Sequence, residues 1–266
     1  MNDPILDVTG IRVGISNVPD IDPILDGISL RVMSGTMHGL VGETGSGKSM
    51  TAKAVVGLLP RGIEVVDGSI VFNGLECVGM DEQTYSGLRG RDIGMIFQNP
   101  RTALYPLATV RAQISNILKA HLELSSEERT SRIYEILNQV GIDDAERVGS
   151  SYPHELSGGM AQRVVIAAAI VCDPKFVIAD EPTTGLDLTI QRQILELISE
   201  LQESLGLSIL MITHDLGIVA QYCDSVTVLR SGFVVEAGDV GTVLVEPNQE
   251  YTKQLIESSR LERMKK

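Results

Sequence analysis

Short apolar runs alternate with longer amphipathic stretches over the second half of the chain. Residues 176–179, 208–212 and 226–229 are short apolar runs, and helical stretches separate the first two. A further apolar run ends at Gly39-Leu40-Val41. Strands that are buried on both faces have few polar positions, so this arrangement predicts a core of buried parallel strands.

The N-terminal part has the pattern of an antiparallel sheet. Residues 11–15 and 28–33 are candidate strands, and residues 16–23 between them are rich in Asn, Asp and Pro, which marks a loop. Asn73-Gly74 follows the apolar run 70–72 and predicts a hairpin turn. We therefore expect an antiparallel sheet beside the Gly-rich loop that is described below.

Three segments have helical patterns. Residues 49–59 are rich in Ala and Leu and end at a Pro-Arg-Gly sequence. Residues 109–140 have helical periodicity, and Ser125 with Glu128 three positions later predicts a helix start closed by a capping box. Residues 249–263 predict a closing helix. We interpret the middle segment as a helical insertion.

Composition narrows the class of protein. The chain has 266 residues, 43% of them hydrophobic, and a formal net charge of −13. Its length allows one large domain or a core with an inserted subdomain. The acidic balance disfavours a nucleic-acid-binding face, which needs a net positive patch. Cys77, Cys172 and Cys223 lack short spacings, so we expect reduced thiols rather than a disulfide framework or a metal site.

No segment predicts export or membrane insertion. The N-terminus lacks the basic run and apolar stretch of a signal peptide. The longest apolar run, residues 164–172, is far shorter than the ~20 residues that a membrane span needs. We therefore expect a soluble chain, which another polypeptide would have to hold at a membrane.

The first motif with chemical content is a Gly-rich loop between an apolar strand and a helix. Residues 42–49 fit the phosphate-binding pattern G-x-x-x-x-G-K-[ST]. The glycines allow backbone N–H groups to converge on phosphate oxygens, and the following helix adds its positive end. Lys48 would reach the β and γ phosphates, and Ser49 would bind Mg²⁺. The alternative is an ordinary Gly-rich turn. The predicted nucleotide contacts are Gly42, Glu43, Thr44, Gly45, Ser46, Gly47, Lys48, Ser49 and Met50.

The second motif is the apolar run 176–179, which ends in the adjacent carboxylates Asp180 and Glu181. Asp180 at the strand end can hold the water shell of Mg²⁺. Glu181 points the other way, where a carboxylate can orient or deprotonate the attacking water. The alternative is a solvated strand end, but a phosphate loop with Lys48 requires a strand of this kind.

The order of the motifs resembles that of an ABC transporter ATPase over nearly the whole chain. The matching residues are Phe97-Gln98, Leu156-Ser157-Gly158-Gly159, Asp180-Glu181-Pro182, Thr184-Gly185-Leu186-Asp187 and Thr213-His214-Asp215. The resemblance implies an α/β fold, namely a P-loop NTPase (RecA-like) core with an antiparallel β subdomain and an inserted α-helical subdomain. It divides the single ABC ATPase domain (1–266) into a core (1–98 and 166–245), a helical insertion (99–165) and a C-terminal helical tail (246–266).

The resemblance also implies roles for residues outside the two motifs. Gln98 would sense the γ phosphate and Mg²⁺, and His214 would contact the γ phosphate and hold Glu181. Asp187 would lie at the interface of two ATPase subunits. The residues that would bind the γ phosphate held by the opposite subunit are Ser157, Gly158 and Gly159. The alternatives are a polar loop residue for Gln98, a structural histidine for His214, and helix caps for Ser157 and Asp187.

Two stretches resemble the dipeptide, oligopeptide and nickel import branch of this family. They are residues 98–106, and Pro247 with residues 251–255; Met160 is also typical of that branch. The resemblance implies ATP and Mg²⁺ as cofactors and a peripheral position at the cytoplasmic face of the inner or plasma membrane. The implied partners are a second, distinct ATPase subunit, two permease subunits and an extracytoplasmic binding protein. The short tail and residues 98–101 favour nickel or a metal chelate over a peptide as cargo.

Two other functions compete with import. An exporter ATPase shares all the motifs. A soluble ABC ATPase acting on DNA or ribosomes is disfavoured by the single phosphate loop, the absence of a heptad run and the charge of −13.

No aromatic residue precedes Phe72 to stack on adenine, and Ile15, Ile21 or Ile24 would give a weaker apolar contact. We assign no adenine-stacking residue.

Overall fold

The computed structural model describes residues 3–16 and 21–264. Its contacts divide the chain into two compact units. Unit 1 combines residues 1–85 with 208–266, and unit 2 comprises residues 86–207. The predicted boundaries of the helical insertion, 99 and 165, differ from this division, which also assigns residues 86–98 and 166–207 to unit 2. The functional boundaries of the core and the insertion therefore stay a prediction.

Unit 1 contains an antiparallel sheet of strand order β2-β1-β4-β5. Its strands are β1 (Pro4–Ile15), β2 (Leu25–Met33), β4 (Ile63–Phe72) and β5 (Leu75–Glu76). In β2, buried and exposed residues alternate, as a sheet with one covered face requires. Asn73 and Gly74 both have positive φ and form the predicted hairpin turn between β4 and β5. The predicted antiparallel sheet is confirmed, and the predicted loop 16–23 lies partly outside the described residues.

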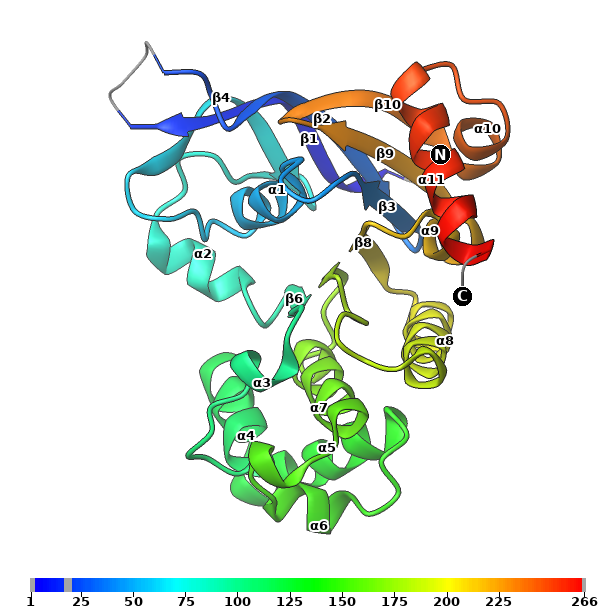
Figure 1. Ribbon diagram of the computed structural model, residues 1–266. Coiled ribbons are helices and arrows are strands. Elements are labelled where there is room, and N and C mark those ends of the chain that lie inside the picture. Colours follow the sequence, from blue (N-terminus) through cyan, green and yellow to red (C-terminus); the bar gives the residue numbers. More distant parts are fainter. Residues whose placement is uncertain (1–2, 17–20, 265–266) are drawn as a thin grey trace. The chain divides into compact units, whose positions relative to one another are not determined.

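The second group of strands in unit 1 surrounds β3 (Figure 1). β3 pairs in parallel with β8 on one side and with β9 on the other, and β10 pairs antiparallel with β9. Every residue of β3 and β8 is buried, which confirms the predicted buried parallel strands. The bounds are β3 (Met37–Val41), β8 (Ser208–Thr213), β9 (Ser225–Arg230) and β10 (Phe233–Asp239).

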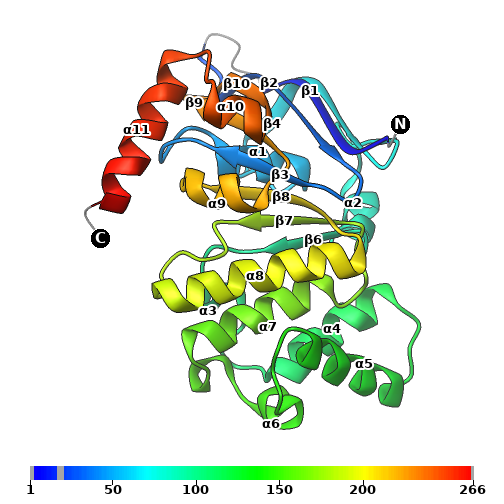
Figure 2. The ribbon, with the colours of Figure 1, turned by 90° about the vertical axis from the view of Figure 1, so that its right-hand side faces the viewer.

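The helices of unit 1 begin and end at local signals. The predicted helix 49–59 is α1 (Lys48–Val55), which ends earlier than expected because Gly57 adopts φ 63°. Near the C-terminus, α9, α10 and α11 pack on one another and on β9 and β10 (Figure 2). Their bounds are α9 (Leu216–Tyr222), α10 (Val240–Val245) and α11 (Glu250–Met264). α2 (Glu82–Leu88) crosses the division between the units.

Unit 2 combines two parallel strands with a group of helices (Figure 1). The strands are β6 (Ile93–Ile96) and β7 (Phe176–Asp180), and α7 packs against β6. Ser125 and Glu128 form the predicted capping box at the start of α5. The helices are α3 (Pro100–Ala103), α4 (Val110–His121), α5 (Ser126–Gln139), α6 (Ala145–Ser150), the 3-10 turn η1 (Pro153–Glu155), α7 (Gly158–Ile170) and α8 (Leu188–Leu205).

Candidate functional site

The Gly-rich loop of unit 1 follows β3 and leads into α1. Gly42 has φ 154°, and a Cβ atom there would lie 2.2 Å from the Leu229 carbonyl oxygen, so only glycine fits. α1 opens at Gly47, which has no side chain to cap the helix. A helix start of this kind presents backbone N–H donors and the positive end of the helix dipole, which suits an anion.

Lys48 places its ammonium group inside the loop. Its side chain is buried, and Nζ donates to the Gly42 carbonyl at 2.7 Å and the Glu43 carbonyl at 3.0 Å. The lysine therefore holds a positive charge among the backbone groups that the phosphate pattern predicts. Of the other predicted contacts, Ser46 is buried, whereas Thr44 and Ser49 are exposed.

His214 lies at the same edge of the parallel strands as this loop. Thr213 at the end of β8 pairs in register with Val41 at the end of β3. The chain therefore leaves both strands together, into Gly42 on one side and His214 on the other. The Asp215 amide donates to Thr213 Oγ1 at 3.0 Å, and Asp215 caps α9 by accepting from the Gly217 amide at 2.7 Å. This rigid turn carries the exposed His214.

Unit 2 uses the same arrangement for Gln98 and Glu181. Ile96 of β6 pairs in register with Ala179 of β7, so both polar segments begin at one edge. Gln98 Nε2 donates to Glu181 Oε2 at 2.9 Å, and Thr184 Oγ1 donates to the same oxygen at 2.9 Å. Glu181 has φ 44°, which is uncommon for a residue with a side chain. The turn and the two donors thus fix the carboxylate that sequence analysis assigned to water activation.

A second Gly-rich loop in unit 2 begins α7. Ser157 caps the helix by accepting from the Met160 amide at 3.3 Å, so the capping alternative is confirmed as a structural role. A Cβ atom on Gly159 would lie 2.9 Å from Ile190 Cγ2. Asp187 caps α8 by accepting from the Ile190 amide at 3.1 Å. The fold therefore brings the second loop and the Asp187 segment together.

The metal ligands expected from the sequence are all oxygen donors. Asp180 is half-buried at the carboxyl end of β7, Ser49 is exposed in the first turn of α1, and Gln98 bonds to Glu181. Hydroxyl, carboxylate and amide oxygens suit a hard cation such as Mg²⁺. Among the described residues, no three His, Cys, Asp or Glu side chains gather into a metal site of their own. This donor set therefore fits a cation that keeps most of its ligands from water and phosphate.

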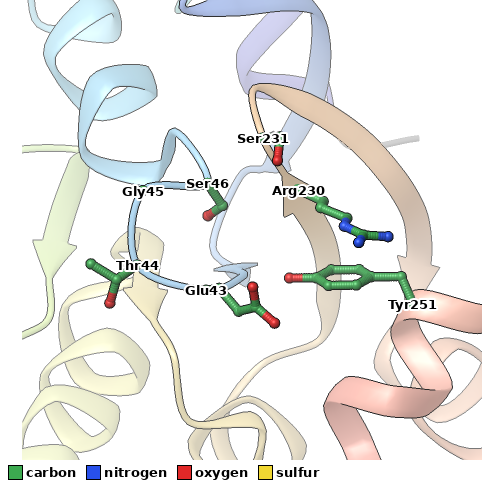
Figure 3. A pocket seen from close by; sticks show the side chains of 7 residues that line it. All are labelled: Glu43, Thr44, Gly45, Ser46, Arg230, Ser231 and Tyr251. Carbon is green, nitrogen blue, oxygen red and sulfur yellow. The ribbon is translucent and has the colours of Figure 1, made fainter.

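Two parts of the site were not predicted. Thr184 belongs to a recognised motif, but its bond to Glu181 depends on a turn that the sequence does not reveal. A small pocket also adjoins the phosphate loop in unit 1 (Figure 3). The residues that line it are Glu43, Thr44, Gly45, Ser46, Arg230, Ser231 and Tyr251.

The comparisons with known proteins agree with this geometry. Residues 25–184 match the family model described as ABC transporter. The chain belongs to the ABC transporter family. A putative peptide import ATP-binding protein of Brucella abortus is 44% identical over 262 residues, which are 96% of this chain and 77% of that protein. An ABC ATPase fold and a role in ATP hydrolysis follow from family membership.

Two further likenesses bear on activity and length. A peptidoglycan transport ATP-binding protein of Agrobacterium fabrum is 44% identical over 254 residues, which are 95% of this chain but only 46% of that protein. The chain thus spans about half the length of that relative. The dimeric post-hydrolysis structure of the cassette MJ0796 with ADP and Pi has a TM-score of 0.77 and 25% identity, and covers 88% of this chain and 98% of that one.

Proposed function

We propose that this chain is the ATP-hydrolysing subunit of an ABC importer that takes up peptides through a separate permease. The observation that carries import is the match of 96% of the chain to a peptide import ATP-binding protein. The same likeness favours a peptide over the nickel or metal chelate that sequence analysis favoured. It also favours import over export, because the shared motifs alone do not distinguish the two directions.

The proposed chemistry begins at the phosphate loop. Residues 42–50 bind the triphosphate of ATP through backbone amides, the dipole of α1 and the ammonium group of Lys48. Ser49, Asp180 and Gln98 hold Mg²⁺, which when bound neutralises charge on the phosphates. Ile15, Ile21 and Ile24 are all more than a third exposed and offer the base an apolar contact without stacking.

Hydrolysis relies on the carboxylate at the end of β7. Glu181 orients and deprotonates the attacking water, and Gln98 and Thr184 fix its position. His214 contacts the γ phosphate from the end of β8. A second ATPase subunit supplies its own Ser157, Gly158 and Gly159 to this phosphate, and Asp187 lies at that interface.

The proposed partners place the chain at a membrane. No helix within the described residues has the length and apolar character to cross a bilayer. Two permease subunits would therefore hold the protein at the cytoplasmic face, where a distinct second ATPase subunit completes the pair. An extracytoplasmic binding protein selects the cargo, and we propose no contact with nucleic acid.

The test is uptake of a labelled oligopeptide and of labelled nickel in cells that carry only wild-type or only Glu181→Gln protein. We expect peptide uptake to be lost while the purified variant still binds ATP. Glu196→Gln is the matched control, because Glu196 lies on the exposed face of α8 and pairs there with Arg192. Loss of nickel uptake alone would refute the peptide assignment, and unchanged uptake of both would refute import.

A further inference from the structure

The pocket beside the phosphate loop joins that loop to the start of α11. It has a volume of about 60 Å³. In this measure about 10–15 Å³ holds one water molecule, so the pocket has room for only a few waters. Figure 3 shows the ring of Tyr251 entering it from α11, with its hydroxyl end directed at the Glu43 segment. The pocket is therefore a contact between two elements rather than a second ligand site.

Buried residues of the core pack against Tyr251. It is 7% exposed and belongs to a buried apolar cluster that includes Val41, the residue before the phosphate loop. Glu236 of β10 fixes the chain just before α11 by accepting from the amides of Asn248 at 2.8 Å and Gln249 at 3.2 Å. The ring thus has a defined position relative to the end of β3.

Arg230 and Glu43 flank the ring. The Arg230 guanidinium lies 4.7 Å from the ring centroid, a distance typical of a cation–π contact. The Tyr251 hydroxyl is buried and lies near the Glu43 amide, and it forms no hydrogen bond with the residues that the structure describes. Burial raises the pKa of this hydroxyl, so it stays neutral at physiological pH.

Glu43 connects the Tyr251 pocket with the phosphate site. Its carbonyl accepts from Lys48 Nζ at 3.0 Å, so the Glu43 backbone, together with the Gly42 carbonyl at 2.7 Å, positions the ammonium group. The other end of the loop is tied separately, because the Gly232 amide donates to the Ser46 carbonyl at 2.9 Å. Tyr251 is a side chain of α11 that lines the pocket beside the first half of the loop.

We propose that Tyr251, held under Arg230, is a positioning residue of the phosphate loop: it fixes the Glu43 backbone and thereby Lys48, and so sets the affinity for ATP. This inference rests on the proposed function, because it takes residues 42–49 as the ATP site. On this inference, α11 stabilises the ATP site in addition to packing on the core.

The test compares ATP dissociation constants and steady-state ATPase kinetics of purified variants. Tyr251→Leu removes the ring, and we expect the Kd and KM for ATP to rise roughly three- to tenfold. We expect kcat to stay within about twofold, because the loop acts in binding. Tyr251→Phe keeps the ring under Arg230 and should restore the affinity. Arg230→Gln should weaken affinity in the same direction, and it does not disturb the core because Arg230 is exposed.

Two controls separate this role from its alternatives. Leu255→Ala loosens the packing of the same helix on the same cluster, and we expect a lower thermal midpoint with unchanged ATP affinity. Equal losses of affinity in Leu255→Ala and Tyr251→Leu would overturn the inference, since docking of α11 alone would then explain both.

Lys48→Ala tests the ATP site itself. If it abolishes binding while the Tyr251 and Arg230 variants bind like wild type, only the inference is wrong. If Lys48→Ala binds ATP normally, the proposed site is wrong and the inference with it.

Discussion

The strand that leads into the phosphate loop contains a buried histidine that should make the protein sensitive to acid. His38 of β3 is 4% exposed, and its ring nitrogens lie 2.7 Å from Ser225 Oγ and 2.9 Å from Thr227 Oγ1 of β9. Burial lowers the pKa of His38 from 6.5 to about 4. The native state therefore keeps the ring neutral over a pH range in which the unfolded chain binds a proton.

The sign and size of the effect follow from this difference in pKa. Stability falls as pH drops below the unfolded pKa, because protons stabilise the unfolded chain more than the native protein. With pKa values of 6.5 and about 4, the contribution lost between pH 7.5 and pH 5 is about 2 kcal/mol. Below pH 4 the native ring also binds a proton, and the loss levels off at about 3 kcal/mol.

The assay is urea denaturation of wild type and His38→Gln at pH 7.5, 6.5, 5.5 and 5.0. Glutamine cannot titrate, yet its amide can still bond to one of the two hydroxyls. Other groups titrate alike in both proteins, so the difference between the two pH profiles isolates His38. We expect wild type to lose about 2 kcal/mol more than the variant between pH 7.5 and pH 5. Parallel profiles would show that the native ring binds a proton over the same pH range as in the unfolded chain, and would refute the reasoning.

Two further predictions concern the two halves of the site. Gln98→Ala removes a donor to Glu181 and should lower kcat by roughly tenfold or more, as steady-state ATPase kinetics would show; a rise in KM alone would contradict the positioning role. Gly42→Ala would force a Cβ atom to within 2.2 Å of the Leu229 carbonyl and should weaken ATP binding by more than about tenfold in a direct titration. Gly241→Ala is its control, because a Cβ atom there meets nothing within 4 Å, and equal affinities of the two variants would exclude the close packing as the cause.

Much of this fold could be predicted because its signals are local. The capping box at Ser125, the Asn73-Gly74 turn and the apolar run of β7 each act within a few residues. The contact of Gln98 with Glu181 is different, since 83 positions separate the two residues. The family resemblance implied a role for Gln98 at the γ phosphate and Mg²⁺ but no contact with Glu181, and the register of β6 and β7 explains that contact.

The features that sequence analysis missed depend on packing between distant segments. Tyr251 lies more than 200 positions from Glu43, and no pattern within α11 shows that its ring reaches the phosphate loop. In the sequence, the C-terminal motif containing Tyr251 indicates only the transporter branch. Its contact needs β9 and β10 to position Arg230 and Glu236, and these strands acquire their places only when the sheet forms.

The two units place their candidate functional residues in the same way. In each, a pair of parallel strands ends in register, and the residues just beyond the strands carry the chemistry: Gly42 and His214 in unit 1, and Gln98 and Glu181 in unit 2. In the proposed function, the first pair binds phosphate, and the second pair fixes the carboxylate that activates water. Because each pair is built inside its own unit, a lesion in either should leave the other intact. Substitutions in the phosphate loop and at Tyr251 should therefore change the affinity for ATP, whereas substitutions around Glu181 should change kcat.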